Sequence, residues 1–533
     1  MKPLLALEAV WDVVEKNQHR PFLIDSVHDR IINYGEFAAL ACSVARRLRG
    51  MGIGQGDRVV IVLHNCSEFP ILYFACLFLG TVAVPVNPLL HKREIEFILK
   101  NSGANAVIFS PTTKDRVSDV VFNGPRPHLV CLQTDSRDVE SSEAQVWAIS
   151  APSDAPNDSW RPFQGVSPES LYSITFTSGT TSVPKGVPHR IDSLLSNAML
   201  FNTALGFGPD NRFYHVLPMS YMAGFLNTLL SPFMAGASVV IGRAFDARLA
   251  IQFWDAPLKY GVDTLWLVPT ILSTLLRIDR NVAGHGYCQN HIKTICVGTA
   301  PLPLKLKKEW EEKYGVTLFE SYGLSETLFV TTNCRTVRYL PGSVGPALPG
   351  IHLRVVDDGG RELSVGETGE IEIQTPFLMA GYLNYDTQQP DSGMLSEWVP
   401  TGDIGRLGRE GHLFVTDRKK DLIIRGGVNI SPRAVEDVLM RHETVLQAIV
   451  VGLPHEFYGE EVVAVVKLKE GNTLEAAQPL LVSLCKENLS AASVPTRFVL
   501  RTEFPVNTTG KIQKGKLREQ LIAELATGAN THS

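Results

Sequence analysis

Strand-like and helical patterns alternate along most of the chain, and this rhythm limits the available folds more than any other feature. Residues 58–63 and 106–109 are short apolar runs typical of buried strands, whereas residues 34–48 and 91–101 repeat apolar side chains at helical spacing. This order predicts a largely parallel, doubly wound sheet. The rhythm resumes after residue 186 and continues to about residue 331, which predicts a second α/β unit.

The pattern changes in the last third of the chain. Residues 345–415 contain short alternating strands and glycine turns, typical of a small β-rich unit, and helix and strand patterns mix after residue 422. Residues 417–421 are a charged run without apolar periodicity, as expected of a hinge. We therefore predict an α/β protein with a large N-terminal lobe over residues 1–416, consisting of two doubly wound α/β subdomains and the β-rich unit. A hinge at 417–421 and a small, mobile α+β C-terminal lobe over 422–533 would follow.

Composition excludes several classes of protein. The 533 residues carry a net charge of −5, which gives no electrostatic reason to expect a nucleic-acid partner. The eight cysteines include no CxxC pair, so neither zinc nor a disulfide framework is expected. The longest apolar stretch, residues 69–90, is interrupted by Gly80, Pro85 and Pro88, and no signal peptide is evident, so we expect a cytoplasmic protein without a transmembrane segment.

One stretch has the composition of an anion-binding loop. It follows the strand-like residues 171–176 and reads Thr177-Ser178-Gly179-Thr180-Thr181-Ser182-Val183-Pro184-Lys185-Gly186. Glycine lets the backbone approach a ligand, the hydroxyl groups can donate to phosphate oxygens, and the lysine adds a positive charge. The glycine and Ser/Thr spacing of the P-loop is absent. A solvated linker is the alternative. Residues 182–185 also match the serine–lysine motif of penicillin-recognising enzymes, but the companion motifs of those enzymes are absent from the sequence.

Two further stretches carry residues suited to a nucleotide. Residues 320–327 bring together an aromatic ring for a purine, Tyr322, and a carboxylate for Mg²⁺, Glu326. The alternative is a strand-to-helix turn capped by Ser325. Residues 398–403 end on Asp403, which could accept hydrogen bonds from ribose hydroxyls, although a simple turn has the same pattern.

Two stretches near the C-terminus say little individually. Residues 425–432 form a glycine-rich connection into a helix predicted over 433–441, and a tight loop with an N-cap would look the same. Residues 505–511 form a turn that presents Lys511, although most lysines are simply solvated. Only their order and spacing relative to the stretches above make these two stretches informative about function.

Together these stretches resemble the motifs of the adenylate-forming family of acyl-CoA synthetases, aryl-CoA ligases, luciferases and peptide-synthetase adenylation domains. The resemblance extends from about residue 7 to residue 521, and residues 268–270, 298–302 and 366–370 add smaller matches. Members of this family join a carboxylate to AMP with release of pyrophosphate, and then transfer the acyl group, usually to the thiol of coenzyme A. The resemblance therefore implies ATP, Mg²⁺ and coenzyme A as ligands.

The resemblance also implies roles for particular residues. Lys511 would bridge the attacking carboxylate and the α-phosphate, Lys185 would assist at the phosphates, and Glu326 would bind Mg²⁺. The small lobe would rotate about Lys420 between the two steps. Coenzyme A would be bound by Gly426 and Gly427. The nucleotide would be bound by Thr177, Ser178, Gly179, Thr180, Thr181, Lys185, Gly298, Thr299, Ala300, Tyr322, Ser325, Asp403 and Arg418.

The sequence departs from the family pattern at several places, among them Ala434, where a Glu is common. Position 182 is Ser where Gly is usual, and Ser325 replaces the usual Thr. Ser220 and Tyr221 stand where many relatives carry a Phe-His pair near the acyl carboxylate and the approach of the thiol. These changes leave the acceptor open, and a carrier protein or an amine is the alternative to coenzyme A.

The acid itself is constrained only by exclusion. Tyr221, Met222, Gly224 and Phe225 are expected to line the acyl pocket, and they supply no carboxylate that could pair with an α-ammonium group. We therefore expect a small-molecule carboxylic acid of fatty or other apolar character, of unspecified chain length. A homodimer is compatible with the sequence. A non-catalytic nucleotide-binding protein is disfavoured because Glu326, Asp403 and Lys511 are all present.

Overall fold

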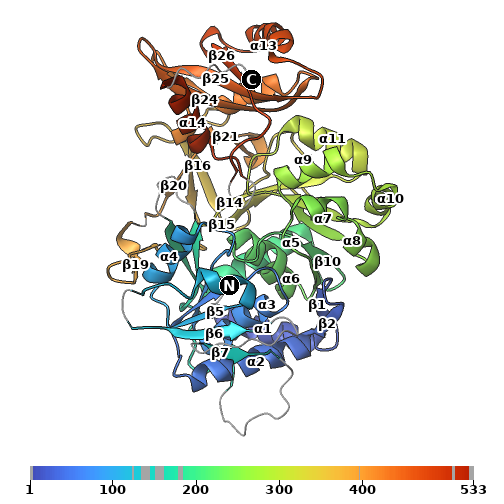
Figure 1. Cartoon of the computed structure of the whole chain (residues 1–533), viewed down its shortest axis with the longest axis vertical. Coiled ribbons are helices and arrows are strands. Elements are labelled where there is room, and N and C mark those ends of the chain that lie inside the picture. The colour runs from blue at the N-terminus through green and yellow to red at the C-terminus, as the bar shows by residue number, and fades with distance from the viewer. Residues whose placement is uncertain are drawn as a thin grey trace.

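The computed structural model describes residues 4–122, 125–133, 144–149, 161–177, 184–394, 396–506 and 511–526. It is a mixed α/β structure in which the C-terminal residues form a separate body, orange to red in Figure 1, above the larger remainder. The predicted fold class is confirmed. Within the described residues, no helix combines the length and the apolar composition needed to cross a membrane.

The first sheet has the order β7-β6-β5-β3-β4-β8-β9, with every pair parallel except β8 and β9. Helix α3 (Glu68–Leu79) is buried on all sides, as its uniformly apolar sequence requires. Helix α4 (Lys92–Asn101) covers this sheet with one apolar face. The strands are β3 (Arg58–Val62), β4 (Val82–Pro85), β5 (Ala106–Phe109), β6 (His128–Leu132), β7 (Gln145–Trp147), β8 (Leu171–Thr177) and β9 (Lys185–Arg190).

The second sheet has the order β15-β14-β13-β12-β10-β11-β1-β2 and is antiparallel only at its two edges. Strand β1 pairs with β11 through Leu23 opposite Val239. Its strands are β1 (Pro21–Asp25), β2 (Arg30–Asn33), β10 (Arg212–His215), β11 (Ser238–Ile241), β12 (Thr264–Leu267), β13 (Thr294–Val297), β14 (Leu318–Leu324) and β15 (Leu328–Thr332).

The two sheets exchange strands, contrary to the sequence-based division into consecutive units. The N-terminal strands β1 and β2 belong to the second sheet, while β8 and β9 complete the first. One apolar core combines side chains from both sheets with helices between them. The remaining helices of this part are α1 (Leu4–Asn17), α2 (Tyr34–Gly50), α5 (Ile191–Leu205), α6 (Ser231–Met234), α7 (Ala247–Ile251), α8 (Asp255–Tyr260), α9 (Pro269–Ile278), α10 (Val282–His291) and α11 (Leu304–Tyr314).

The predicted β-rich unit is a four-stranded antiparallel sheet of β16 (His352–Val356), β17 (Gly369–Gln374), β20 (Val399–Leu407) and β21 (Leu413–Arg418). Two alternatives considered for nearby segments do not describe the structure. The segment ending on Asp403 lies in strand β20 and is not a simple turn, and residues 325–327 connect β14 to β15 in a hairpin without a helix.

The C-terminal body has its own sheet and its own apolar clusters. The short turn Lys419–Asp421 connects it to β21. Its strands are β22 (Ile423–Arg425), β23 (Val428–Ile430), β24 (Val445–His455), β25 (Gly459–Leu468) and β26 (Arg497–Leu500), and its helices are α12 (Pro432–Leu439), α13 (Leu474–Asn488) and α14 (Lys514–Ala526). We refer below to residues before 417 as the large lobe and to residues after 421 as the small lobe.

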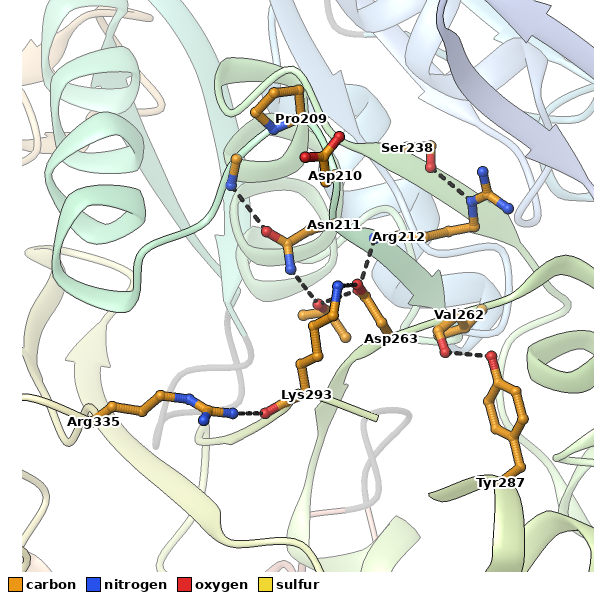
Figure 2. Close-up of polar contacts among 12 residues, drawn as sticks. Pro209, Asp210, Asn211, Arg212, Ser238, Val262, Asp263, Tyr287, Lys293 and Arg335 are labelled. Atoms are coloured by element: carbon orange, nitrogen blue, oxygen red, sulfur yellow. Dashed lines mark hydrogen bonds and ion pairs between the residues drawn. The ribbon is translucent and has the colours of Figure 1, made fainter. Parts of the chain in front are cut away.

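Polar side chains join the amino ends of the strands in the second sheet (Figure 2). The Asp263 carboxylate accepts from the backbone N–H of Arg212 and from Nζ of Lys293, both at 2.8 Å. A cavity of about 630 Å³ lies against this cluster. Because these groups satisfy one another, we assign them to the alignment of strands. Of the predicted nucleotide residues, residues 298–300 and Ser325 follow the opposite, carboxyl ends of β13 and β14.

Candidate nucleotide-binding and active site

Two predicted residues, Tyr322 and Arg418, contact a third, Asp403, and each of the three lies on a separate strand. The Tyr322 hydroxyl on β14 donates to Oδ2 of Asp403 at 2.7 Å, and Nε of Arg418 lies 2.8 Å from Oδ1. Burial raises the pKa of Asp403, and the positive charges of Arg418 and Lys511 oppose that effect. The carboxylate is therefore oriented from both sides, as a fixed acceptor of ligand hydroxyl groups has to be.

A second group of residues surrounds Glu326. The Tyr382 hydroxyl donates to Oε1 of Glu326 at 2.8 Å, and Nζ of Lys185 lies 4.8 Å from the centre of the Tyr382 ring. Tyr382 therefore connects two predicted residues, Lys185 and Glu326, that are far apart in the sequence. Tyr382 was not among the residues predicted from the sequence, in which the preceding glycine is the local signal. Gly381 adopts φ 108°, and a Cβ there would lie 2.2 Å from the Asp391 carbonyl oxygen.

His189, also not predicted from the sequence, holds the segment that carries Ser325 and Glu326. Nε2 of His189 lies 2.5 Å from the backbone carbonyl oxygen of Ser325, so it carries the proton and donates. Burial lowers the pKa of His189 to about 4, so the ring is neutral near pH 7. Strand β9 thus connects Lys185 at its start with the Ser325 loop through His189 near its end.

The turn after β13 is tight and strained. Thr299 adopts φ 68°, a conformation that is costly for a β-branched residue. A Cβ on Gly298 would lie 3.2 Å from the Ser321 carbonyl oxygen, so the turn packs closely against β14. Strain of this kind is concentrated at ligand sites. The assignment of Gly298, Thr299 and Ala300 to the nucleotide stays a prediction.

Residues 178–183 of the predicted phosphate loop lie outside the described residues, which include the predicted ligands Ser178, Gly179, Thr180 and Thr181 and the departure at Ser182. The two flanks of the loop are described. Thr177 ends β8 and Lys185 begins β9, and the two residues face each other in the antiparallel pair. The hairpin therefore fixes both ends of the loop on one edge of the first sheet.

Lys511 of the small lobe shares this site with the large lobe. Its ammonium group interacts electrostatically with Arg418, Asp403 and Glu326. Although part of the residue is exposed, crowding by protein lowers the pKa of Lys511 to about 8. Arg418 adds to this decrease, and the two carboxylates oppose it. In this orientation of the small lobe, the Lys511 ammonium group is therefore within electrostatic range of both carboxylate groups.

The residues predicted for the hinge and for coenzyme A lie on exposed turns. Lys420 lies in the turn after β21, and Gly426 and Gly427 form the β22–β23 turn with φ values of 58° and 80°. Gly426 N–H donates to the Tyr458 carbonyl at 2.8 Å, which fixes this turn beside the β24–β25 connection. The roles predicted for these three residues stay predictions.

The predicted acyl-pocket residues lie at the start of a π-helix over Ala223–Leu230. Tyr221 and Met222 precede this helix, and Gly224 and Phe225 lie in it. Such a segment is frequent at functional sites. Phe225 is fully buried and stacks on Tyr73 with ring centres 3.7 Å apart. A Cβ on Gly224 would lie 2.0 Å from the Pro218 carbonyl oxygen, so only glycine fits there. Tyr221 is half-buried and Met222 is buried, and pocket lining stays a prediction for all four.

Glu326 fits the requirements of a Mg²⁺ ion that is shared with a triphosphate. Proteins commonly bind such an ion through one or two carboxylates, with substrate phosphates and water supplying the other ligands. Tyr382 occupies one side of Oε1 and orients the carboxylate. Among the described residues, no group of three or more His, Cys, Asp or Glu side chains forms a complete protein metal site. Any Mg²⁺ here would depend on the nucleotide.

Comparison with known proteins identifies the family. The model described as AMP-binding enzyme matches residues 10–383, and the AMP-binding enzyme C-terminal domain matches residues 434–511. The chain is 28% identical over 502 residues to sulfoacetate–CoA ligase of Cupriavidus necator, covering 93% of this chain and 94% of that protein. It is 30% identical to the long-chain-fatty-acid–CoA ligase FadD13 of Mycobacterium tuberculosis, covering 92% and 93%.

A solved structure agrees with these matches. ATP-bound MatB from Rhodopseudomonas palustris superposes with a TM-score of 0.83 at 27% identity, covering 98% of this chain and 99% of that one. The likeness spans both lobes. The chain therefore belongs to the AMP-binding enzyme family of ATP-dependent, AMP-forming acid–thiol ligases.

Proposed function

We propose that this protein is an ATP-dependent carboxylic acid–CoA ligase that acts on a fatty or other apolar acid. The observation that carries the proposal is the electrostatic interaction of Lys511 with Asp403 and Glu326, because it joins a small-lobe cation to the predicted nucleotide site. Each of the three residues has a distinct task in making a mixed anhydride. Asp403 would bind ribose hydroxyl groups, Glu326 would hold Mg²⁺ at the phosphates, and Lys511 would bridge the reacting groups.

The first step joins two anions, so its barrier is largely electrostatic. The carboxylate oxygen of the acid attacks the α-phosphorus, a new O–P bond forms, and the bond to the β-phosphate oxygen breaks to release pyrophosphate. Lys511 would hold the carboxylate beside the α-phosphate, and Lys185 would neutralise charge on the leaving group. Bound Mg²⁺ supplies further neutralisation of the phosphates. Positioned charges of this kind are the main source of catalysis in such reactions.

The second step uses a thiol. The thiol of coenzyme A loses its proton to solvent, its sulfur attacks the acyl carbonyl and forms the thioester bond, and AMP leaves as the bond between the acyl carbon and the phosphate oxygen breaks. Lys511 is not required in its first position for this chemistry. We propose that the small lobe rotates about Lys420, within a hinge at residues 417–421, and that Gly426 and Gly427 then line the path of the thiol. Such closure would exclude water from the reactive acyl adenylate.

The choice of acid is supported by the character of the predicted wall. Relatives named for sulfoacetate and for long-chain fatty acids differ widely in substrate polarity, so family membership leaves the acid open. Met222 and Phe225 are apolar and buried, and Tyr221 contributes an aromatic ring. A wall of this composition favours an apolar acyl chain through burial of its surface.

Pyrophosphate release tests the proposal. The protein is incubated with ATP, Mg²⁺ and a panel of fatty, aromatic, dicarboxylic and sulfonated carboxylic acids, each with and without coenzyme A. We expect acid-dependent pyrophosphate release and, with coenzyme A, an acyl thioester. Adenylation without thioester formation would instead support transfer to a carrier protein or an amine. No pyrophosphate with any acid would contradict adenylation, and preference for a short polar acid would contradict the apolar assignment.

A further inference from the structure

Lys305 of the large lobe caps a helix of the small lobe. It lies on α11, and its Nζ donates to the backbone carbonyl oxygens of Met440 at 2.8 Å and His442 at 3.4 Å. Met440 is the C-cap residue of α12. The last carbonyl groups of a helix lack partners within it and carry the negative end of the helix dipole, so a cation is favourable there. The capping cation comes from the other lobe.

Arg277 makes a second contact of the same kind. It lies on α9, and Nη2 donates to the carbonyl oxygen of Leu446 at 3.1 Å. The pairing of β24 with β25 shifts register between Val445 and Gln447, so Leu446 is the bulged residue that the ladder leaves out. Arg277 therefore supplies a donor to a carbonyl group that the small-lobe sheet does not pair.

Both contacts cross the predicted hinge. The donors Arg277 and Lys305 precede residues 417–421, and their acceptors at residues 440–446 follow it. Helices α9 and α11 pack against each other, so the two donors belong to one rigid surface (Figure 1). Any rotation of the small lobe about Lys420 has to break these hydrogen bonds. They exist in the same orientation in which Lys511 interacts electrostatically with Asp403 and Glu326.

We propose that Lys305 and Arg277 are positioning residues that form an interlobe latch with the carbonyl groups of Met440, His442 and Leu446. The latch holds the small lobe in the orientation in which Lys511 reaches the nucleotide site, and it opens before the thioester step. Neither side chain needs to touch substrate. The inference rests on the proposed two-step function, because a latch of this kind favours the first step over the second.

The half-reactions are measured separately in Lys305→Met, Arg277→Met and the double variant. Adenylation is followed as ATP–pyrophosphate exchange with the best acid, and thioester formation is followed in a single turnover from supplied acyl-AMP and coenzyme A. We expect adenylation to fall about tenfold in the double variant, since the population with Lys511 in place decreases. Thioester formation should be unchanged or faster, and the melting temperature should stay within about 2 °C of wild type.

Two further variants make the test specific. Lys308→Met removes an exposed lysine of the same helix, which pairs with Glu312 at 3.8 Å, and should change neither half-reaction. Lys305→Arg keeps a cationic donor to the helix end and should restore most of the adenylation lost in Lys305→Met. Equal loss of both half-reactions, no loss of either, or the same loss in Lys308→Met would overturn the latch.

Proteolysis of the hinge tests the latch without requiring catalytic activity. Tryptic cleavage of the native protein after Lys419 or Lys420 reports how often the hinge opens, and the double variant should be cleaved several-fold faster than wild type. Cleavage at the wild-type rate would count against the latch. Absence of pyrophosphate release in wild type would contradict the proposed function alone, so the two failures are distinguishable.

Discussion

The two sides of the candidate site are held in different ways. Asp403 is held by Tyr322 of the large lobe and by Arg418 of the predicted hinge within paired strands, so its carboxylate is oriented without a ligand. Lys511 is carried by the small lobe, so its interaction with Asp403 and Glu326 depends on how that lobe is oriented. Under the proposed function, this difference would separate preorganised binding from catalysis that depends on lobe position.

The sharpest test of this contrast is Lys511→Ala. We expect adenylation to fall about 10²- to 10³-fold, the effect of removing one charge-stabilising donor from a preorganised site. Thioester formation from supplied acyl-AMP should be nearly unaffected, because that step uses another lobe orientation. Lys516→Ala, at an exposed lysine on α14, is the matched control. Equal loss of both half-reactions would contradict the prediction that Lys511 acts in adenylation alone.

Asp403→Asn tests the preorganised side. A hydrogen bond that involves a charged group contributes about 1.5–3 kcal/mol, so we expect the KM for ATP to rise roughly 10- to 150-fold. The loss should extend to AMP binding measured by calorimetry, which needs no turnover. Asp386→Asn, at an exposed carboxylate, should leave both values unchanged. Normal AMP affinity in Asp403→Asn would show that this carboxylate does not hold the nucleotide.

The pH dependence tests the charge on the mobile side. The pKa of Lys511 is lowered to about 8, so the ammonium form is present below that pH and is lost as pH rises through it. If adenylation needs the cation, kcat/KM for ATP should fall about tenfold from about pH 7 to about pH 9. Bound ATP is anionic and favours the cation, so the fall in kcat should occur at higher pH.

A matched variant identifies the group responsible for that profile. Lys511→Arg stays charged throughout this range, so any adenylation it retains should show no fall between these pH values. An identical decline in Lys511→Arg and wild type would assign the titration to another group. A flat wild-type profile would show that the cation is not lost in the free enzyme.

The smallest expected effect concerns Tyr382→Phe. It removes the hydroxyl that orients Glu326 and keeps the ring beside Lys185. We expect about a three- to tenfold rise in the Mg²⁺ concentration that gives half-maximal adenylation, the usual range for one hydrogen bond. Tyr382→Leu also removes the ring and should raise the KM for ATP further. Unchanged Mg²⁺ dependence in both variants would show that Tyr382 has no role in Mg²⁺ binding at this site.

The sequence by itself determined the repeated α/β pattern, the β-rich unit and most of the residues that meet at the site. Strand and helix periods are local properties, and the motif residues are close together within each stretch. Tyr322, Glu326, Asp403 and Lys511 were therefore accessible from spacing and resemblance. The segment that carries Asp403 has the sequence pattern of a turn, yet it lies in a strand in which Gly402 adopts a positive φ.

Only the tertiary structure decided which distant segments meet. It placed the N-terminal strands β1 and β2 in the second sheet, brought Tyr382 between Lys185 and Glu326, and set Lys305 against the end of α12. No local period encodes these pairings, because each depends on how buried faces and unpaired backbone groups of separate elements fit together. The chain thus carries its chemistry in short motifs, and long-range packing brings the motifs together.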